Sequence, residues 1–190
     1  MTRMMSQYLR ACVLLVSAMT LSGCYTTQAQ IKHSALKSTG EVKNAGILVH
    51  AIKDERPDAQ PKIIGGVYNG YDMRMGDVNQ PDTLLEDLRL ALVDQFRASG
   101  YRIQSDESDL VVDASIRMLS CDVRSSSKSA LSINVRLSDH GKVVFEDTYA
   151  MNESKFWLIA ADPTCSEPLN TLVRKSFEKI VKDIDQYLAS

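Results

Sequence analysis

Residues 110–155 read LVVDASIRMLSCDVRSSSKSALSINVRLSDHGKVVFEDTYAMNESK, and this stretch decides the fold. Apolar and polar side chains alternate along it in three successive runs, which is typical of strands with one buried and one solvated face. Two clusters of turn-forming residues, 125–128 and 139–142, separate the runs. The pattern predicts a three-strand antiparallel meander.

Two amphipathic helices are predicted on either side of the meander. From Pro81 to Gly100, large apolar residues recur at three- and four-residue spacing, with acids near the start and a glycine at the end. A second apolar stripe runs from about 168 to 188, with Ser166 as its expected N-cap. We interpret both stripes as surfaces that face the core and not as cofactor sites.

Short apolar runs before and after the first helix complete the sheet. The β-branched run at 46–53 predicts a strand that is buried on nearly both faces. Residues 63–68 predict a second strand or a loop, a glycine-punctuated loop follows, and another short strand is expected at 101–104. The simplest arrangement is an α+β fold, in which a mostly antiparallel sheet carries both helices on one face.

The N-terminus has the organisation of a bacterial lipoprotein signal. A basic segment, 1–10, precedes an apolar segment, 11–19, that is too short to cross a bilayer as a helix. Leu21-Ser22-Gly23-Cys24 then supplies small residues before a cysteine, as a lipobox does. We expect cleavage before Cys24 and acylation of its thiol. An ordinary signal followed by an incidental thiol is the alternative.

The residues after Cys24 bear on location and on domain organisation. In lipoproteins of enteric-type bacteria an Asp directly after the lipidated Cys retains the protein in the inner membrane, and the Tyr25 found here favours the outer membrane. Residues 25–45 are polar and poor in large apolar groups, which predicts a flexible tether. We therefore expect a signal peptide over 1–23, a lipidated cysteine and tether over 24–45, and a single periplasmic domain over 46–190.

The cysteines divide by compartment. Cys12 leaves with the signal and Cys24 is acylated, so that Cys121 and Cys165 remain as one pair in an oxidising periplasm. A disulfide between them would stabilise the fold by ~4 kcal/mol at most from chain entropy. Two reduced thiols that never meet are the alternative.

Composition and motifs argue against several functional classes. The net charge is −2 at pH 7 with interspersed charges, so we expect no nucleic-acid partner and no basic patch for anionic lipid. His33, His50 and His140 lack metal-ligand spacing, and none has a nucleophile in a recognisable setting. The acids of 54–58 and 105–109 are expected to be solvated turn residues. We expect no metal, no cofactor and no enzymatic activity.

One stretch is a candidate contact surface for a protein partner. Large apolar side chains are spaced among the glycines of 65–77, and residues of these types are favoured at protein interfaces. They are Tyr68, Tyr71, Met73 and Met75. The alternative is a hairpin or irregular strand packed over the sheet edge. Trp157, within the apolar run 156–159, poses the same choice between a contact anchor and a buried residue.

These features together resemble those of a known family. The lipobox, the Asp54-x-Arg56 turn, the Ile64-Gly65 pair, a helix ending in 99–101, and a meander followed by a terminal helix make the chain similar to the YajG family of bacterial lipoproteins. The resemblance implies an α+β periplasmic domain on a lipid anchor, with no catalytic residues to transfer. The element order is also similar to that of LptE, the lipoprotein partner of the lipopolysaccharide-assembly barrel, although the second strand and the glycine-rich loop are additions.

The expected function follows from the anchor and the resemblance. We expect a non-enzymatic, outer-membrane lipoprotein that is held by its N-terminal lipid and binds or helps to assemble a cell-envelope component. One alternative is an envelope hydrolase or transferase that acts on cell-wall or lipid substrates through acids of the loops. A second alternative is a ring-forming secretion or flagellar accessory.

Overall fold

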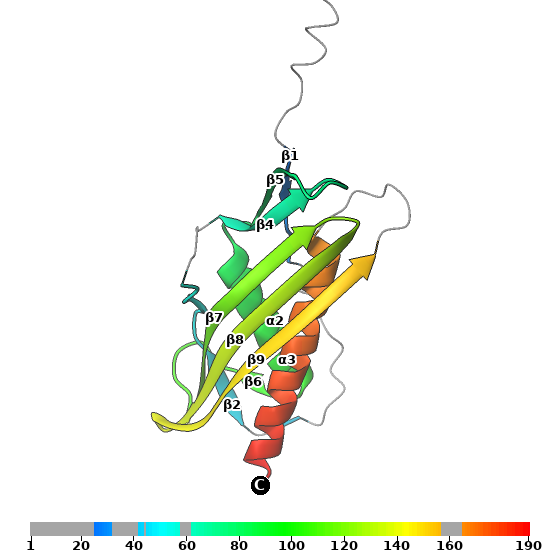
Figure 1. Ribbon diagram of the computed structural model, residues 1–190. Coiled ribbons are helices and arrows are strands. Elements are labelled where there is room, and N and C mark those ends of the chain that lie inside the picture. Colours follow the sequence, from blue (N-terminus) through cyan, green and yellow to red (C-terminus); the bar gives the residue numbers. More distant parts are fainter. Residues whose placement is uncertain (1–24, 32–41, 44, 58–61, 157–164) are drawn as a thin grey trace, which may run out of the picture.

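A computed structural model describes residues 25–31, 42–43, 45–57, 62–156 and 165–190. One twisted sheet carries two helices, α2 (Leu84–Ala98) and α3 (Ser166–Leu188), on the same face (Figure 1). The predicted α+β class and both predicted helices are confirmed. Within the described residues, no helix is both long enough and apolar enough to span a bilayer.

The predicted meander is present, but residues 126–128, which were expected in its first turn, belong to a strand. It consists of β7 (Leu110–Val123), β8 (Ser126–Asp139) and β9 (Lys142–Phe156), paired antiparallel along nearly their whole lengths. At the β8–β9 turn, His140 and Gly141 have φ angles of 49° and 77°. Two successive positive φ angles produce the tight hairpin turn whose twist matches that of the strands.

Three short strands share the other edge of β7, and all three run parallel to it. They are β2 (Gly46–Val49), β3 (Lys53–Asp54) and β4 (Ile63–Tyr68). The single strand predicted at 46–53 is therefore two strands with a break between them. Outside these, β6 (Arg102–Ile103) pairs parallel with β2, and β5 (Arg74–Asn79) pairs antiparallel with β4. The sheet is mixed, with its long pairings antiparallel and its short ones parallel.

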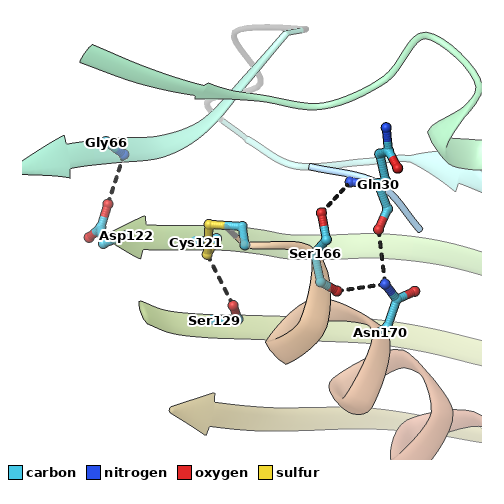
Figure 2. The surroundings of a disulfide bond; sticks show 8 residues. Gln30, Gly66, Cys121, Asp122, Ser129, Ser166 and Asn170 are labelled. Atoms are coloured by element: carbon cyan, nitrogen blue, oxygen red, sulfur yellow. Dashed lines mark hydrogen bonds between the residues drawn. A yellow bond between two sulfur atoms is a disulfide. The ribbon is translucent and has the colours of Figure 1, made fainter. Parts of the chain in front are cut away.

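The expected loop at 65–77 is the β4–β5 hairpin. It packs closely on the meander at Gly65, where a Cβ atom would lie 1.8 Å from the backbone carbonyl oxygen of Cys121. The backbone N–H of Gly66 donates to the Asp122 carboxylate at 3.0 Å (Figure 2). Glycine allows this approach because it has no side chain to collide with the neighbouring backbone.

The prediction of a tether from residue 25 is wrong for residues 25–31. Strand β1 (Tyr25–Gln28) pairs parallel with β5, and the N–H of Ala29 donates to the carbonyl of Asn79 at 2.9 Å. Ala29 and Ile31 are buried, with 1% and 7% of their surface exposed. The composition of residues 25–31 does not reveal this strand, because an edge strand is held by backbone hydrogen bonds, which do not depend on apolar side chains.

The same segment is fastened to the start of α3. The backbone N–H of Gln30 donates to the Ser166 hydroxyl at 3.0 Å, and the Asn170 side chain donates to the Gln30 carbonyl at 2.9 Å (Figure 2). Ser166 is thus not the N-cap that the sequence predicted. The cap position is Cys165, and it makes no side-chain capping bond.

The helices and the sheet enclose one core. The first helix ends as predicted, with Gly100 in the left-handed region at φ 91°. Phe96 of α2 meets the Tyr101 ring edge to face, with centroids 5.5 Å apart. The Tyr101 hydroxyl donates to Asp185 near the end of α3 at 2.6 Å, so that both helices and β6 are tied at this end of the molecule. Burial, together with the Asp185 carboxylate, raises the pKa of Tyr101 and keeps its hydroxyl a donor.

Candidate functional site

The predicted disulfide is present. Cys121, near the end of β7, and Cys165, directly before α3, form a bridge with their Cα atoms 6.0 Å apart (Figure 2). Both residues are buried, and the Ser129 hydroxyl donates to the Cys121 sulfur at 3.1 Å. The bridge fastens the start of α3 to the sheet at the point where α3 also holds Gln30.

The tip of the β4–β5 hairpin, residues 69–75, holds the apolar residues that the sequence singled out. Asn69 organises this hairpin tip, since its side-chain oxygen accepts the backbone N–H groups of Tyr71 at 2.9 Å and Met73 at 3.0 Å. Its own backbone N–H donates to the Met73 carbonyl at 3.0 Å. Asp72 has a positive φ of 60°, which completes the reversal of the chain.

Three of the four candidate contact residues on this hairpin are exposed. Tyr71 exposes 86% of its surface, Met73 56% and Met75 51%. Tyr68 is different, because the Arg124 guanidinium covers its ring at 4.3 Å from the centroid. Tyr68 is therefore partly covered, and a contact role for these residues stays a prediction. Trp157, the fifth candidate, lies outside the described residues.

The opposite end of the molecule has an open groove of about 780 Å³, here called the distal groove. It is lined by β2, β6, loop 104–109, the start of β7 and the β8–β9 turn. Figure 1 shows β2, β6 and that turn at the end of the fold away from β1, β4 and β5. Leu48, Leu110 and Val111 supply apolar surface between polar loop residues.

Two histidines of the distal groove have carboxylate neighbours. His50 Nδ1 lies 2.9 Å from Asp113 Oδ1, and His140 Nδ1 lies 2.7 Å from Asp139 Oδ1. The hydrogen bond to Asp139, reinforced by the charge of Asp109, raises the pKa of His140. Both imidazoles are solvent-accessible, and the prediction that they are structural stays a prediction.

The carboxylates of loop 105–109 are exposed, as the sequence predicted. Asp106, Glu107 and Asp109 line the groove and are exposed. Among the residues that the structure describes, no group of three or more His, Cys, Asp or Glu side chains is arranged to hold a metal ion. The geometry of the groove suits hydrogen bonding to a polar ligand better than chemistry that needs a desolvated acid.

The Asp54-x-Arg56 turn is not a solvated turn as the sequence analysis expected. The Arg56 guanidinium donates two hydrogen bonds to the Asp54 carboxylate, at 2.8 and 2.6 Å, and a third to the Gln80 side chain at 2.9 Å. Only 8% of the Arg56 side chain is exposed. These hydrogen bonds lower the pKa of Asp54. The motif joins β3 to the segment that leads into α2, and its role is structural.

Sequence reasoning missed the relation between the hairpin tip and the N-terminus. Strand β1 starts at Tyr25, which pairs with Gly76 of β5, so that the first described residue lies beside the hairpin (Figure 1). The only available signal was the two apolar residues, Ala29 and Ile31, in an otherwise polar segment.

Comparison with known proteins identifies the fold. No described protein family and no curated protein matches the sequence. Among solved structures, protein XCC0632 from Xanthomonas campestris, of the DUF330 family, is 16% identical, with a TM-score of 0.52 over 83% of this chain and 91% of that protein. Protein CT253 from Chlamydia trachomatis is 11% identical, with a TM-score of 0.50 over 76% of this chain and 98% of that one. The chain shares its fold with these bacterial proteins.

A looser similarity is to a lipoprotein. GNA1162 from Neisseria meningitidis is 12% identical, with a TM-score of 0.41 over 75% of this chain and 99% of that one. The resemblance to the YajG family stays a prediction.

Proposed function

We propose that this protein is a non-enzymatic lipoprotein of the YajG type, anchored in the bacterial outer membrane, that binds or helps to assemble a cell-envelope component. The observation that carries the proposal is the position of Tyr25. It is the first residue after the lipobox cysteine and also the first residue of β1. A lipid on Cys24 would therefore attach directly to the folded domain.

Two further features support an exported, anchored protein. The Cys121–Cys165 bridge suits an oxidising compartment such as the periplasm. Several acyl chains, at ~0.8 kcal/mol per buried methylene, hold a protein on a membrane far more firmly than a single myristoyl chain does. Tyr25, in place of an Asp, favours the outer membrane.

The distal groove is the surface that we assign to the envelope partner. It lies at the end of the domain away from β1 and would face the periplasmic space in an anchored protein. Its apolar floor and its polar rim, which carries both carboxylates and imidazoles, suit a ligand with mixed polar and apolar groups.

A crosslinking experiment tests this assignment. The acylated full chain carries a photo-activatable residue in place of Gln104, an exposed residue of the groove, and is irradiated in cells. The matched control carries the same residue in place of Lys182, which is exposed on α3. An envelope adduct formed at position 104 and absent at position 182 is expected. Equal labelling at both positions, or none at 104, would contradict the assignment, and a chain recovered without acyl groups would contradict the anchoring.

The enzyme hypothesis has one observation in its favour, the two histidine–carboxylate pairs in the groove. Against it, the loop carboxylates are exposed, whereas a carboxyl that acts as a general acid near neutral pH needs burial to raise its pKa. Incubation of the protein with cell-wall and lipid extracts distinguishes the enzyme hypothesis from the non-enzymatic proposal. Turnover that is lost in Asp109→Asn would overturn the non-enzymatic proposal.

A further inference from the structure

The hairpin tip lies at the same end of the fold as the residue that carries the proposed lipid. Because β1 and β5 run parallel with Tyr25 opposite Gly76, the first described residue lies beside the tip end of β5. Covalent geometry holds consecutive Cα atoms about 3.8 Å apart, and paired strands lie ~4.8 Å apart. An acyl group on Cys24 would therefore be attached one residue before the strand that pairs with β5.

The remainder of the tip extends beyond the level of Met75. The chain reverses between Tyr68 and Arg74, so that Tyr71 and Met73 lie farther from the core than the start of β1 does. A bilayer that takes up acyl chains attached directly before Tyr25 would lie beside the hairpin tip. The anchor and the tip cannot be separated by a long tether, since residues 25–31 belong to the fold.

The side chains at the tip suit the interfacial region of a membrane. Tyrosine is enriched at that depth because its ring is apolar and its hydroxyl can stay hydrated. Met73 and Met75 add flexible apolar groups that adapt to a disordered surface. The three residues are among the most exposed large apolar side chains that the structure describes.

Charged side chains at the hairpin are paired, one of them with Arg124 of the β7–β8 turn. Arg124 bonds to the Asp72 carboxylate, and Arg74 lies 2.8 Å from Asp77. A surface of this kind gains little from anionic headgroups, so that a membrane contact here depends on apolar burial and responds weakly to salt.

The turn at the tip is shaped by Asn69 and does not depend on the Tyr71 ring. The Asn69 side-chain oxygen accepts hydrogen bonds from the backbone N–H groups of Tyr71 and Met73, and these bonds shape the turn. The Tyr71 ring takes no part in them and is exposed. A preformed tip loses little conformational entropy on binding. Replacing Tyr71 should therefore change the contact without changing the hairpin.

We propose that the hairpin tip is a second membrane-contact site, at which Tyr71, Met73 and Met75 enter the interface of the bilayer that holds the Cys24 lipid. The inference rests on the proposed acylation and adds a fixed orientation to it. With two points of attachment, the domain stands on its β1–β5–β4 end and presents the distal groove away from the membrane. A protein partner at the tip is the competing occupant, and the closeness of the anchor favours lipid.

Tryptophan fluorescence tests the contact. The acylated full chain carries Tyr71→Trp in a Trp157→Phe background, which removes the single native tryptophan. The matched control carries Val143→Trp, an exposed position beside the β8–β9 turn at the other end of the fold. Both proteins are reconstituted into vesicles of phosphatidylethanolamine and phosphatidylglycerol, with and without brominated acyl chains. Circular dichroism verifies that both variants are folded.

We expect a blue shift and strong quenching by brominated lipid at position 71, unchanged by salt, and neither effect at position 143. A chain that floats with the vesicles but shows no quenching at 71 overturns the inference and leaves the lipid anchor standing. A chain that does not float overturns the anchor and the inference together.

A second measurement uses the native background. A photo-activatable residue in place of Tyr71, in cells, should form lipid adducts. Exclusive formation of a protein adduct would show that the tip is a protein interface and would overturn the membrane contact.

Discussion

Loss of the Cys121–Cys165 bridge should lower the free energy of unfolding by up to about 4 kcal/mol. The bridge joins residues 44 positions apart, and in the chain-entropy description a closed loop of this length restricts the unfolded chain by ~13 cal/mol/K. For a domain of this size, each kcal/mol corresponds to a change in Tm of ~2–4 °C. The expected fall in Tm is therefore ~8–16 °C.

The effect on the native state should be local. The bridge holds the start of α3, and α3 in turn holds Gln30 through Ser166 and Asn170. Without the bridge, hydrogen exchange should accelerate first in β1 and in the opening turn of α3, while the meander stays protected by its long pairings.

The assay is denaturant unfolding of residues 25–190, without the predicted signal and lipidated cysteine, followed by circular dichroism. Because both half-cystines are buried, the reduced state is prepared by unfolding and refolding in a reductant. Comparison of oxidised and reduced wild type isolates the cross-link, since both sulfur atoms remain in place. The double variant C121A/C165A is the control, and its stability should not respond to reductant. A difference between oxidised and reduced protein below about 1 kcal/mol would refute the reasoning, because the constraint on the unfolded chain could not then be as large as the loop length implies.

Three further substitutions test the packing. Ile31→Ala should lower the free energy of unfolding, measured in urea, by about 2–4 kcal/mol because the side chain is buried in the core. Val42→Ala, at an exposed position, should leave it almost unchanged. Equal effects of the two substitutions would favour a flexible tether at residues 25–31. Gly65→Ala should destabilise the domain by more than about 3 kcal/mol, since its Cβ would overlap a backbone oxygen of β7, and Gly70→Ala, with open space around it, is the matched control in the same thermal-melting assay. Arg56→Ala should cost about 3 kcal/mol at neutral pH by leaving a partly buried carboxylate unpaired. Because Arg56 lowers the pKa of that carboxyl, its contribution should be fully present above the ordinary carboxyl pKa and should disappear as pH falls through the lowered value; a loss that is independent of pH would contradict the ion-pair account.

Local sequence patterns predicted the long elements correctly. The meander follows from alternation with period two between turn-forming clusters, and β7, β8 and β9 lie where that pattern placed them, except that β8 begins at Ser126, inside the predicted turn. The helices follow from apolar stripes with a period near 3.6. These signals are reliable because each long element must bury one face, and burial imposes a repeat that can be read without knowledge of the neighbouring elements.

The short strands and turns were predicted less well because they are stabilised by contacts with elements that are distant in the sequence. The run at 46–53 gave no sign of the break between β2 and β3. There the chain takes four residue steps from Val49 to Lys53 while β7 takes three from Val112 to Ser115, so the pairing is interrupted. The acids of 54–58 were expected to be solvated, yet Asp54 is paired with an arginine that also reaches Gln80. Periodicity along the chain cannot show that a turn bonds to a residue far away in the sequence, as the turn at Arg56 does to Gln80.

The sequence by itself determined the α+β class, the meander, both helices, the pair of cysteines available for a bridge, and the lipobox that predicts an anchor at Cys24. Only the tertiary structure decided that residues 25–31 belong to the fold, that Tyr71 is exposed while Tyr68 is partly covered, and that the hairpin tip lies beside the start of β1. The physical reason is that β1 is held by backbone hydrogen bonds to β5. Every residue except proline can both donate and accept such bonds, so they cannot be predicted from a pattern of side chains.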